Sequence, residues 1–104
     1  MDTLKVEIQV PQAESVSINS DELNVELRDG RYISVPLALF PRLVHATLEE
    51  RENWRLIAGG HGIHWEQLDE DISIEGLIAG RGSQESQVSL KKWLDMRSPA
   101  ISDA

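Results

Sequence analysis

The chain has 104 residues, a net charge of −8 and no cysteine. This length suits one domain with a single core, and the lack of cysteine excludes disulfides, thiolate metal sites and a cysteine nucleophile. The longest apolar run is far short of the ~20 residues that cross a bilayer, and no secretory signal precedes the first alternating segment. We therefore expect a cytoplasmic protein that does not bind membranes.

The charge is unevenly distributed. Residues 1–80 carry six Lys and Arg against fifteen Asp and Glu, a net charge of −9, whereas residues 81–104 carry four against three, a net charge of +1. Nucleic-acid affinity comes largely from Lys and Arg that neutralise phosphates, so the acidic body predicts no direct nucleic-acid binding. The same charge also fits a domain that is merely kept soluble.

The first 35 residues predict an antiparallel meander of strands. Apolar and polar residues alternate over residues 4–10, 16–18 and 23–27, the period-2 pattern of strands with one buried face. Asp29-Gly30 is a hairpin signal before a further strand over residues 31–35.

The register of this hairpin follows from the apolar pattern. A two-residue loop would pair Glu26 with Ile33 and mix polar with apolar residues on one face. A three-residue loop over residues 28–30 pairs Val25 with Ile33 and keeps apolar residues together. We therefore predict this loop, with Gly30 left-handed in a bulge.

Two short helices are predicted next. Pro36 is compatible with the first turn of a helix, but the ring of Pro41 would clash with a preceding carbonyl in a continuous one, so we expect a kink or a fresh start there. Thr47 and Glu50 fit a capping box for a second helix that ends near Glu52.

A second hairpin follows over residues 54–65, with its turn at the glycines of residues 59–62. Its alternation places Ile63 and Trp65 on one face and His64 on the other. Ser73 then predicts the N-cap of a short helix over residues 74–79, with Gly80 at its C-terminal cap.

Residues 1–80 thus form one predicted domain, and residues 81–104 a linker and a C-terminal amphipathic helix with a frayed tail. In this helix Leu90, Trp93 and Leu94 share a face that is too apolar to stay in water. It would dock on the same body, on a second copy as a homodimer, or on a partner, in that order of preference.

The predicted fold class is α+β: an antiparallel β-meander packed against short helices, with a second hairpin and a C-terminal helix. Its predicted inward residues are Val6, Ile8, Val16, Ile18, Val25, Leu27, Ile33, Val35, Phe40, Leu43, Leu56 and Leu77.

An ordered set of short motifs resembles one small bacterial family, the domain of unknown function 2442. The resemblance covers residues 4–80, with residues 86–94 similar to the helical extension of longer members. The motifs are Asp29-Gly30-Arg31, Val35-Pro36-Leu37, Phe40-Pro41-Arg42-Leu43, Ala46-Thr47, Glu50-Arg51, Gly62-Ile63-His64-Trp65, Leu68-Asp69-Glu70-Asp71-Ile72-Ser73 and Glu75-Gly76-Leu77.

The resemblance implies an α+β domain that occurs alone or fused to a DNA-binding helix-turn-helix, often encoded in a toxin–antitoxin-like arrangement. It implies no established activity and transfers no catalytic residue. The residues after Gly80 are too few for a complete helix-turn-helix, which disfavours a repressor.

Residues 61–71 hold the one concentrated group of chemistry-bearing residues, with two histidines and four carboxylates. Metal binding or acid–base catalysis would use His61, His64, Asp69 and Asp71, but no helical metal-ligand spacing is present. In a structural interpretation, Asp69 and Asp71 cap the amides before the Ser73 helix, and His64 pairs with a neighbour on the outer sheet face. In a third interpretation these residues form a recognition surface.

We therefore predict a non-enzymatic protein-interaction module, antitoxin-like in kind, that binds a basic partner through its acidic surface and needs no cofactor or metal. The alternatives are an acidic inhibitor that mimics nucleic acid and a small metal-dependent enzyme. The candidate partner-binding residues are His64, Trp65, Glu66, Asp69, Glu70, Asp71 and Trp93.

Overall fold

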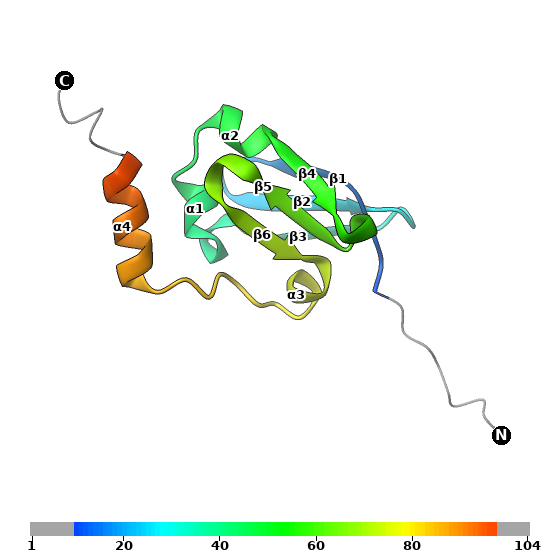
Figure 1. Cartoon of the computed structure of the whole chain (residues 1–104). Helices are drawn as coiled ribbons and strands as arrows, with labels where there is room; N and C mark the ends of the chain where they lie inside the picture. Colours follow the sequence, from blue (N-terminus) through cyan, green and yellow to red (C-terminus); the bar gives the residue numbers. More distant parts are fainter. Residues whose placement is uncertain (1–9, 98–104) are drawn as a thin grey trace.

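The structure is a computed structural model that describes residues 10–97. Within this range it contains two three-stranded antiparallel sheets, short helices between and after them, and a C-terminal helix (Figure 1). The α+β fold class is thereby confirmed. The predicted first strand, including Val6 and Ile8, lies outside the described residues except for Val10, as does the predicted frayed tail over residues 98–104.

The first sheet has the order β1-β2-β3. Its strands are β1 (Ala13–Ile18), β2 (Glu22–Leu27) and β3 (Tyr32–Pro36). The predicted hairpin register is confirmed: Val25 faces Ile33, and the Leu27 N–H donates to the Arg31 carbonyl at 2.8 Å. Gly30 has the left-handed φ of +93° that the three-residue loop requires.

The segment between the sheets forms short helices, as the prolines and the capping box predict. They are a 3₁₀ turn η2 (Leu37–Leu39), α1 (Pro41–Val44) and α2 (Leu48–Glu52). A fresh start at Pro41 is confirmed, because α1 begins with this residue at its first position. The capping box is complete: the Thr47 hydroxyl accepts from the Glu50 N–H, and the Glu50 carboxylate accepts from the Thr47 N–H at 2.9 Å.

The second sheet has the order β4-β5-β6. Its strands are β4 (Trp54–Ile57), β5 (Gly62–Trp65) and β6 (Glu70–Ser73). The 3₁₀ turns η3 (Ala58–Gly60) and η4 (Glu66–Leu68) connect them. The predicted hairpin is present, but β6 was not predicted. The capping role predicted for Asp69 and Asp71 is wrong, because Asp71 lies within β6 opposite His64, and Asp69 takes a left-handed turn conformation.

Two helices follow within the described residues, α3 (Ile74–Ile78) and α4 (Gln87–Arg97). The predicted Ser73 cap is confirmed, since its hydroxyl accepts from the Gly76 N–H at 2.9 Å. Gly80 follows α3 with a φ of +78°. None of the helices between residues 10 and 97 is long and apolar enough to cross a membrane.

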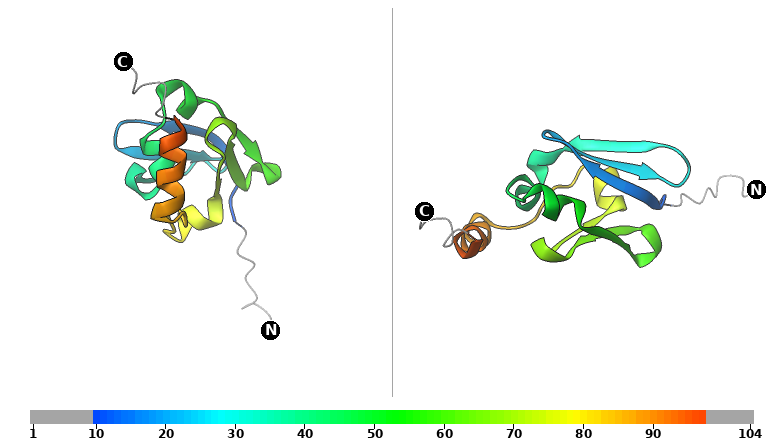
Figure 2. Two further views of the ribbon diagram at one scale, coloured as in Figure 1. Left: turned by 60° about the vertical axis from the view of Figure 1, so that its left-hand side comes forward. Right: turned by 90° about the horizontal axis from the view of Figure 1, so that it is seen from above.

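The two sheets lie over one another as two layers, with α4 beyond one end of them (Figure 2). Apolar side chains from both sheets, α1 and α3 fill the space between. The buried residues are Ala13, Val16, Leu23, Val25, Leu27, Leu37, Phe40, Leu43, Ile63, Trp65, Leu68, Ile72, Ile74 and Leu77.

Six of the predicted inward residues are fully within this core, namely Val16, Val25, Leu27, Phe40, Leu43 and Leu77. Four more pack against it while remaining partly exposed, namely Ile18, Ile33, Val35 and Leu56. The prediction missed Ala13 because a bulge between Ala13 and Ser15 breaks the period-2 count along β1. It also missed most of the contribution of residues 63–74.

Candidate functional site

Trp65 is a core residue and not a surface anchor. Its side chain is 0% exposed, and its indole N–H donates to the Arg51 carbonyl at 3.0 Å. The prediction that Trp65 contacts a partner is therefore wrong. Alternation along β5 correctly paired Trp65 with Ile63, but that pair faces the first sheet and not solvent.

His64 lies on the outer face of the second sheet, where it joins neighbouring strands. Its Nδ1 contacts an Asp71 carboxylate oxygen, and its Nε2 lies 2.8 Å from Glu66 Oε1. Glu66 is in turn 3.4 Å from the Arg55 guanidinium. Asp71, His64, Glu66 and Arg55 therefore form a row of bonded side chains, which we call the His64 row. Both ring nitrogens of His64 have protein partners in it.

The two carboxylates determine the ionisation of this row. Hydrogen bonds to Asp71 first, and then to Glu66, raise the pKa of His64 above its ordinary value. The bond to His64, followed by that to Arg55, lowers the pKa of Glu66. A ring bonded at both nitrogens in this way has no ring nitrogen free to ligate a metal.

A second cluster is centred on Arg42 of α1. Its guanidinium binds Glu85 in a two-pronged fork, with Nε–Oε1 at 2.9 Å and Nη2–Oε2 at 2.6 Å, and its Nη1 donates to the Leu68 carbonyl at 2.7 Å. The pair is well shielded, with side chains 15% and 12% exposed. Hydrogen bonding to Arg42 holds the pKa of Glu85 below its usual value.

Two guanidinium groups lie over the ring of Trp93, a residue of α4. Arg42 is 4.8 Å and Arg97 4.5 Å from the centre of its ring, within range of cation–π attraction. Arg97 also forks onto Glu50 of α2, with Nη2–Oε1 at 2.8 Å and Nη1–Oε2 at 3.0 Å. Within this chain, α4 therefore contacts α1 through Arg42 and α2 through Glu50.

Glu70 and Asp69 lie near this cluster. Glu70 is half-buried on β6, and burial raises its pKa to about 7, with Arg42 opposing the shift. Asp69 is exposed and, with Arg42, Lys92 and Trp93, lines a groove of about 690 Å³ beside α4. The structure thus brings Asp69, Glu70 and Trp93 together around Arg42 and places His64, Glu66 and Asp71 on a separate face.

On the domain surface the arginines have bonding partners, whereas several carboxylates form no salt bridge with another described residue. Each arginine between residues 28 and 55 is bonded to a carboxylate or to backbone carbonyls, namely Arg28, Arg31, Arg42, Arg51 and Arg55. Six exposed carboxylates form no salt bridge with another described residue, namely Asp21, Glu22, Glu49, Glu52, Asp69 and Glu75. The acidic charge of the domain is therefore largely unneutralised at its surface.

Two of these carboxylates lie on α2, and one of them, Glu52, lines a groove beside this helix. Glu49 and Glu52 are exposed on this helix, next to Leu48, whose side chain is 74% exposed. Three residues of α2, Leu48, Arg51 and Glu52, line a groove of about 200 Å³ together with residues of β1 and β4. The Arg51 guanidinium donates to the carbonyls of Leu43 and Val44. We call this feature, comprising Leu48, Glu49, Glu52 and the groove, the acidic α2 surface.

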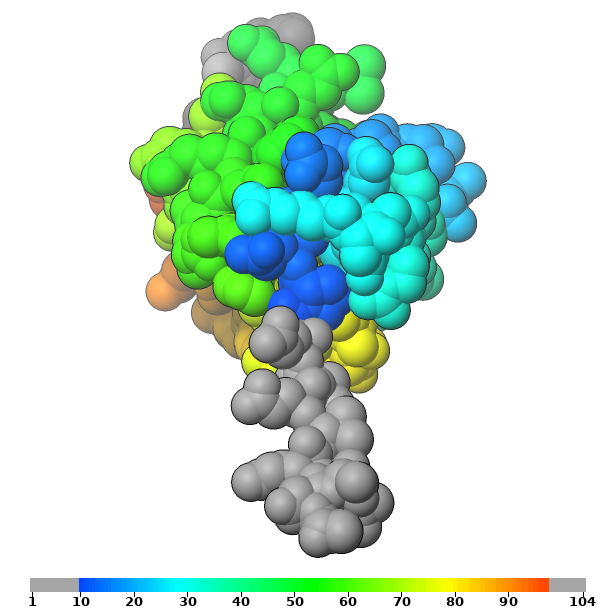
Figure 3. Space-filling view, turned by 90° about the vertical axis from the view of Figure 1, so that its right-hand side faces the viewer, coloured from blue at the N-terminus to red at the C-terminus, as the bar shows by residue number. Residues whose placement is uncertain are grey.

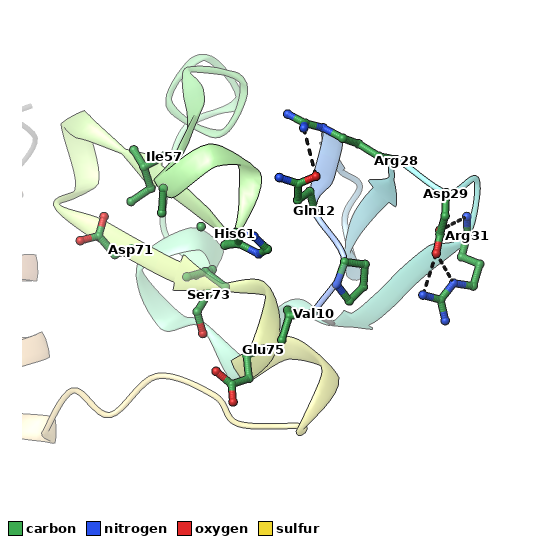
Figure 4. A pocket seen from close by; sticks show the side chains of 14 residues that line it. Val10, Gln12, Arg28, Asp29, Arg31, Ile57, His61, Asp71, Ser73 and Glu75 are labelled. Atoms are coloured by element: carbon green, nitrogen blue, oxygen red, sulfur yellow. Dashed lines mark hydrogen bonds and ion pairs between the residues drawn. The ribbon is translucent and has the colours of Figure 1, made fainter. Parts of the chain in front are cut away.

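The opposite end of the molecule holds a wider groove of about 1070 Å³. Figure 3 shows this end, with the β2–β3 hairpin and the β4–β5 region on either side of the segment that leads into β1. Both arginines that line the groove bond to neighbours: Arg31 to Asp29 at 2.7 Å, and Arg28 to Gln12 at 3.2 Å (Figure 4).

His61 lines this wide groove, whereas His64 is engaged on the outer sheet face. Among residues 10–97, no three His, Asp or Glu side chains are grouped so that they could hold a metal ion. The His61, His64, Asp69 and Asp71 set that a metal-dependent enzyme would use is thus not assembled into one site.

The contact between the C-terminal segment and the domain, which we call the α4 dock, includes four residues that sequence reasoning missed: Arg42, Glu50, Glu85 and Arg97. Each pair is separated by more than forty residues in the chain, so no local spacing reveals it. The available signal was the opposite charge of the tail and the body, which indicates attraction but not the contacting residues.

Comparison with known proteins identifies the family. The profile of a protein of unknown function, DUF2442, matches residues 13–83. A crystal structure of a protein of unknown function from Rhodospirillum rubrum is similar, with 29% identity and a TM-score of 0.64, over 74% of this chain and 95% of that one.

An uncharacterised protein from Chromobacterium violaceum, solved by NMR, has the same fold, with 24% identity and a TM-score of 0.61 over 78% of this chain and 74% of that one. No curated protein matches the chain. Since the family profile spans the domain from β1 through α3, the chain belongs to the DUF2442 family.

Proposed function

We propose that this protein is a non-enzymatic, cytoplasmic interaction module that binds a basic protein partner through the acidic α2 surface. The observation that carries the proposal is the charge imbalance there: Glu49 and Glu52 have no salt-bridge partner among the described residues and flank the exposed Leu48. An exposed apolar side chain beside two carboxylates without a salt-bridge partner suits a partner with a basic, partly apolar segment.

The neighbouring Glu50 supports this choice of partner. The same helix already binds a basic side chain through Glu50, which forks onto Arg97. The family that the sequence resembles is often encoded in a toxin–antitoxin-like arrangement. This favours a small basic protein, toxin-like in kind, as the partner.

Charge reversal on two matched helices tests the proposal. Glu52→Lys and Glu75→Lys change the net charge equally, and each alters an exposed carboxylate on a five-residue helix, α2 or α3. We expect Glu52→Lys to weaken binding to the product of the adjacent gene at least ten-fold and Glu75→Lys to weaken it only slightly. Equal losses would indicate general charge attraction and contradict a site at α2.

The rival metal-dependent enzyme has its own discriminating measurement. Titration calorimetry with Zn, Mn and Ni ions is expected to give no stoichiometric heat if the protein is an interaction module. An acidic inhibitor that mimics nucleic acid would bind its partner in competition with duplex DNA, whereas binding at the α2 surface would continue in the presence of DNA at equal charge concentration.

A further inference from the structure

The attachment of α4 to the domain changes in kind after Ser83. Among the described residues, the last backbone hydrogen bond from the C-terminal segment to the domain runs from the Ser83 N–H to the Leu39 carbonyl at 2.9 Å. Gly82 fits against the same residue so closely that an added Cβ would lie 2.9 Å from the Leu39 oxygen. The family match also ends at residue 83. Beyond this point, among the described residues, side chains of the C-terminal segment make the polar contacts with the domain.

The domain side of the dock is held in place without α4. Arg42 is fixed by the Leu68 carbonyl, and Glu50 is fixed by its capping-box bond to the Thr47 N–H. Both partners of these bonds belong to the family domain. The face therefore presents one cation and one anion in set positions, which lowers the cost of binding a complementary ligand.

The helix side matches this pair of charges. Glu85 and Arg97 meet Arg42 and Glu50 in two fork geometries, and the two guanidinium groups lie over the ring of Trp93. Forked pairs are specific in direction as well as charge. A segment with a carboxylate two residues before the helix, and a tryptophan and an arginine on the helix, is thus recognised at three points.

The helix itself is only lightly buried. No residue of α4 is fully buried, and Trp93, which packs against the core, remains partly exposed. An occupant held by two ion pairs and one half-buried indole is open to replacement by a helix of the same chemistry with more apolar surface.

We propose that the face formed by Arg42 of α1 and Glu50 of α2 is a receptor for a partner helix that carries a carboxylate, a tryptophan and an arginine as Glu85, Trp93 and Arg97 are spaced. The free protein keeps α4 in this receptor, and the partner helix takes its place. The inference rests on the proposed function, because it takes the protein to be a binding module and adds how a partner is recognised.

A synthetic peptide of residues 84–97 is the probe. It is titrated against the wild-type chain and against a full-length triple variant, Glu85→Gln, Trp93→Ala and Arg97→Gln, whose own helix no longer fits the receptor. We expect the variant to bind the peptide at least ten-fold more tightly than the wild type does. Equal affinities would overturn the proposal.

Specificity is tested by exchanging charges. Adding Glu50→Arg to the triple variant should abolish binding of the wild-type peptide and restore binding of a peptide with Arg97→Glu; failure of this rescue would overturn the assignment of Glu50. Circular dichroism checks that each variant is folded. Sedimentation of the wild type should give a monomer, since a dimer lost on Trp93→Ala would make a second copy the occupant.

The peptide experiments use no adjacent-gene product and leave Glu49 and Glu52 unchanged. Their failure is therefore distinguishable from a failure of the proposed function.

Discussion

The domain from β1 to α3 and the helix α4 are held by different forces. Every fully buried apolar residue among residues 10–97 lies between Ala13 and Leu77, where the two sheets and short helices enclose it. The helix α4 relies on Arg42–Glu85, Arg97–Glu50 and one half-buried indole. Burial of apolar surface fixes a fold, whereas paired charges give a contact that is specific and easier to exchange.

The two tryptophans Trp65 and Trp93 provide the largest expected contrast. Trp65→Ala should lower the free energy of unfolding by about 3–5 kcal/mol, because it leaves a large cavity in the core and an unpaired Arg51 carbonyl. Trp93→Ala should lower it by only about 1 kcal/mol or less, since α4 contributes no fully buried residue. Urea unfolding measures both; equal losses would contradict the comparison.

Arg42 connects the two regions, so its loss has the next largest effect. Arg42→Ala removes the partner of the shielded Glu85 carboxylate and the donor to the Leu68 carbonyl, and should cost about 2 kcal/mol. Hydrogen exchange should accelerate throughout residues 87–97 more than in β5. Arg42→Lys is the control: it keeps the charge but not the fork, so an intermediate effect is expected.

Glu70 should make stability depend on pH. Because burial raises its pKa from 4.5 to about 7, its contribution is full below pH 4.5 and is lost as the pH rises toward 7. Allowing for its partial exposure, Glu70→Gln should stabilise the protein at pH 8 by about 1 kcal/mol. Thermal unfolding at pH 5 and pH 8 measures this change. If Glu70→Gln loses as much stability between these pH values as the wild type does, another group is responsible for the pH dependence.

The smallest effect concerns His64 on the exposed face of the second sheet. Since its pKa is raised, its ion pairs contribute fully below pH 6.5, and that contribution is lost as the pH rises through the folded-state pKa. NMR titration should give a midpoint above 6.5 in the wild type and a lower one in Asp71→Asn. An unchanged midpoint in Asp71→Asn would show that Asp71 does not raise the pKa of His64. Glu70→Gln is the control, and it should leave the midpoint of His64 nearly unchanged.

Local patterns predicted much of the chain. Loop register at Gly30, the fresh start at Pro41, the capping box of Thr47 and the cap at Ser73 each depend on residues within a few positions of one another. Strand β6 escaped prediction because its four residues include a single apolar side chain, Ile72. Strand β6 forms by pairing with β5, and the residues of β6 alone do not show this pairing.

The candidate site was less predictable than the fold. Alternation in β5 separated Trp65 from His64 but could not say which face meets the other sheet, so Trp65 was assigned to the surface. Likewise Asp69, Glu70 and Asp71 are consecutive in the chain but face different surroundings: the α4 groove, the edge of the core and the outer sheet face. A run of like residues does not form one surface when it passes through a turn and a strand.

The α+β class, the turns and caps, the net negative charge of residues 1–80 and a C-terminal helix could be predicted from the sequence, because these follow from periodicity, backbone preference and charge. The places where the charges meet are set by the tertiary structure. Arg42 finds Glu85, and Arg97 finds Glu50, across more than forty residues each. Such pairings depend on how the two sheets pack and on where the chain leaves the domain at Ser83, and neither is encoded in a local pattern.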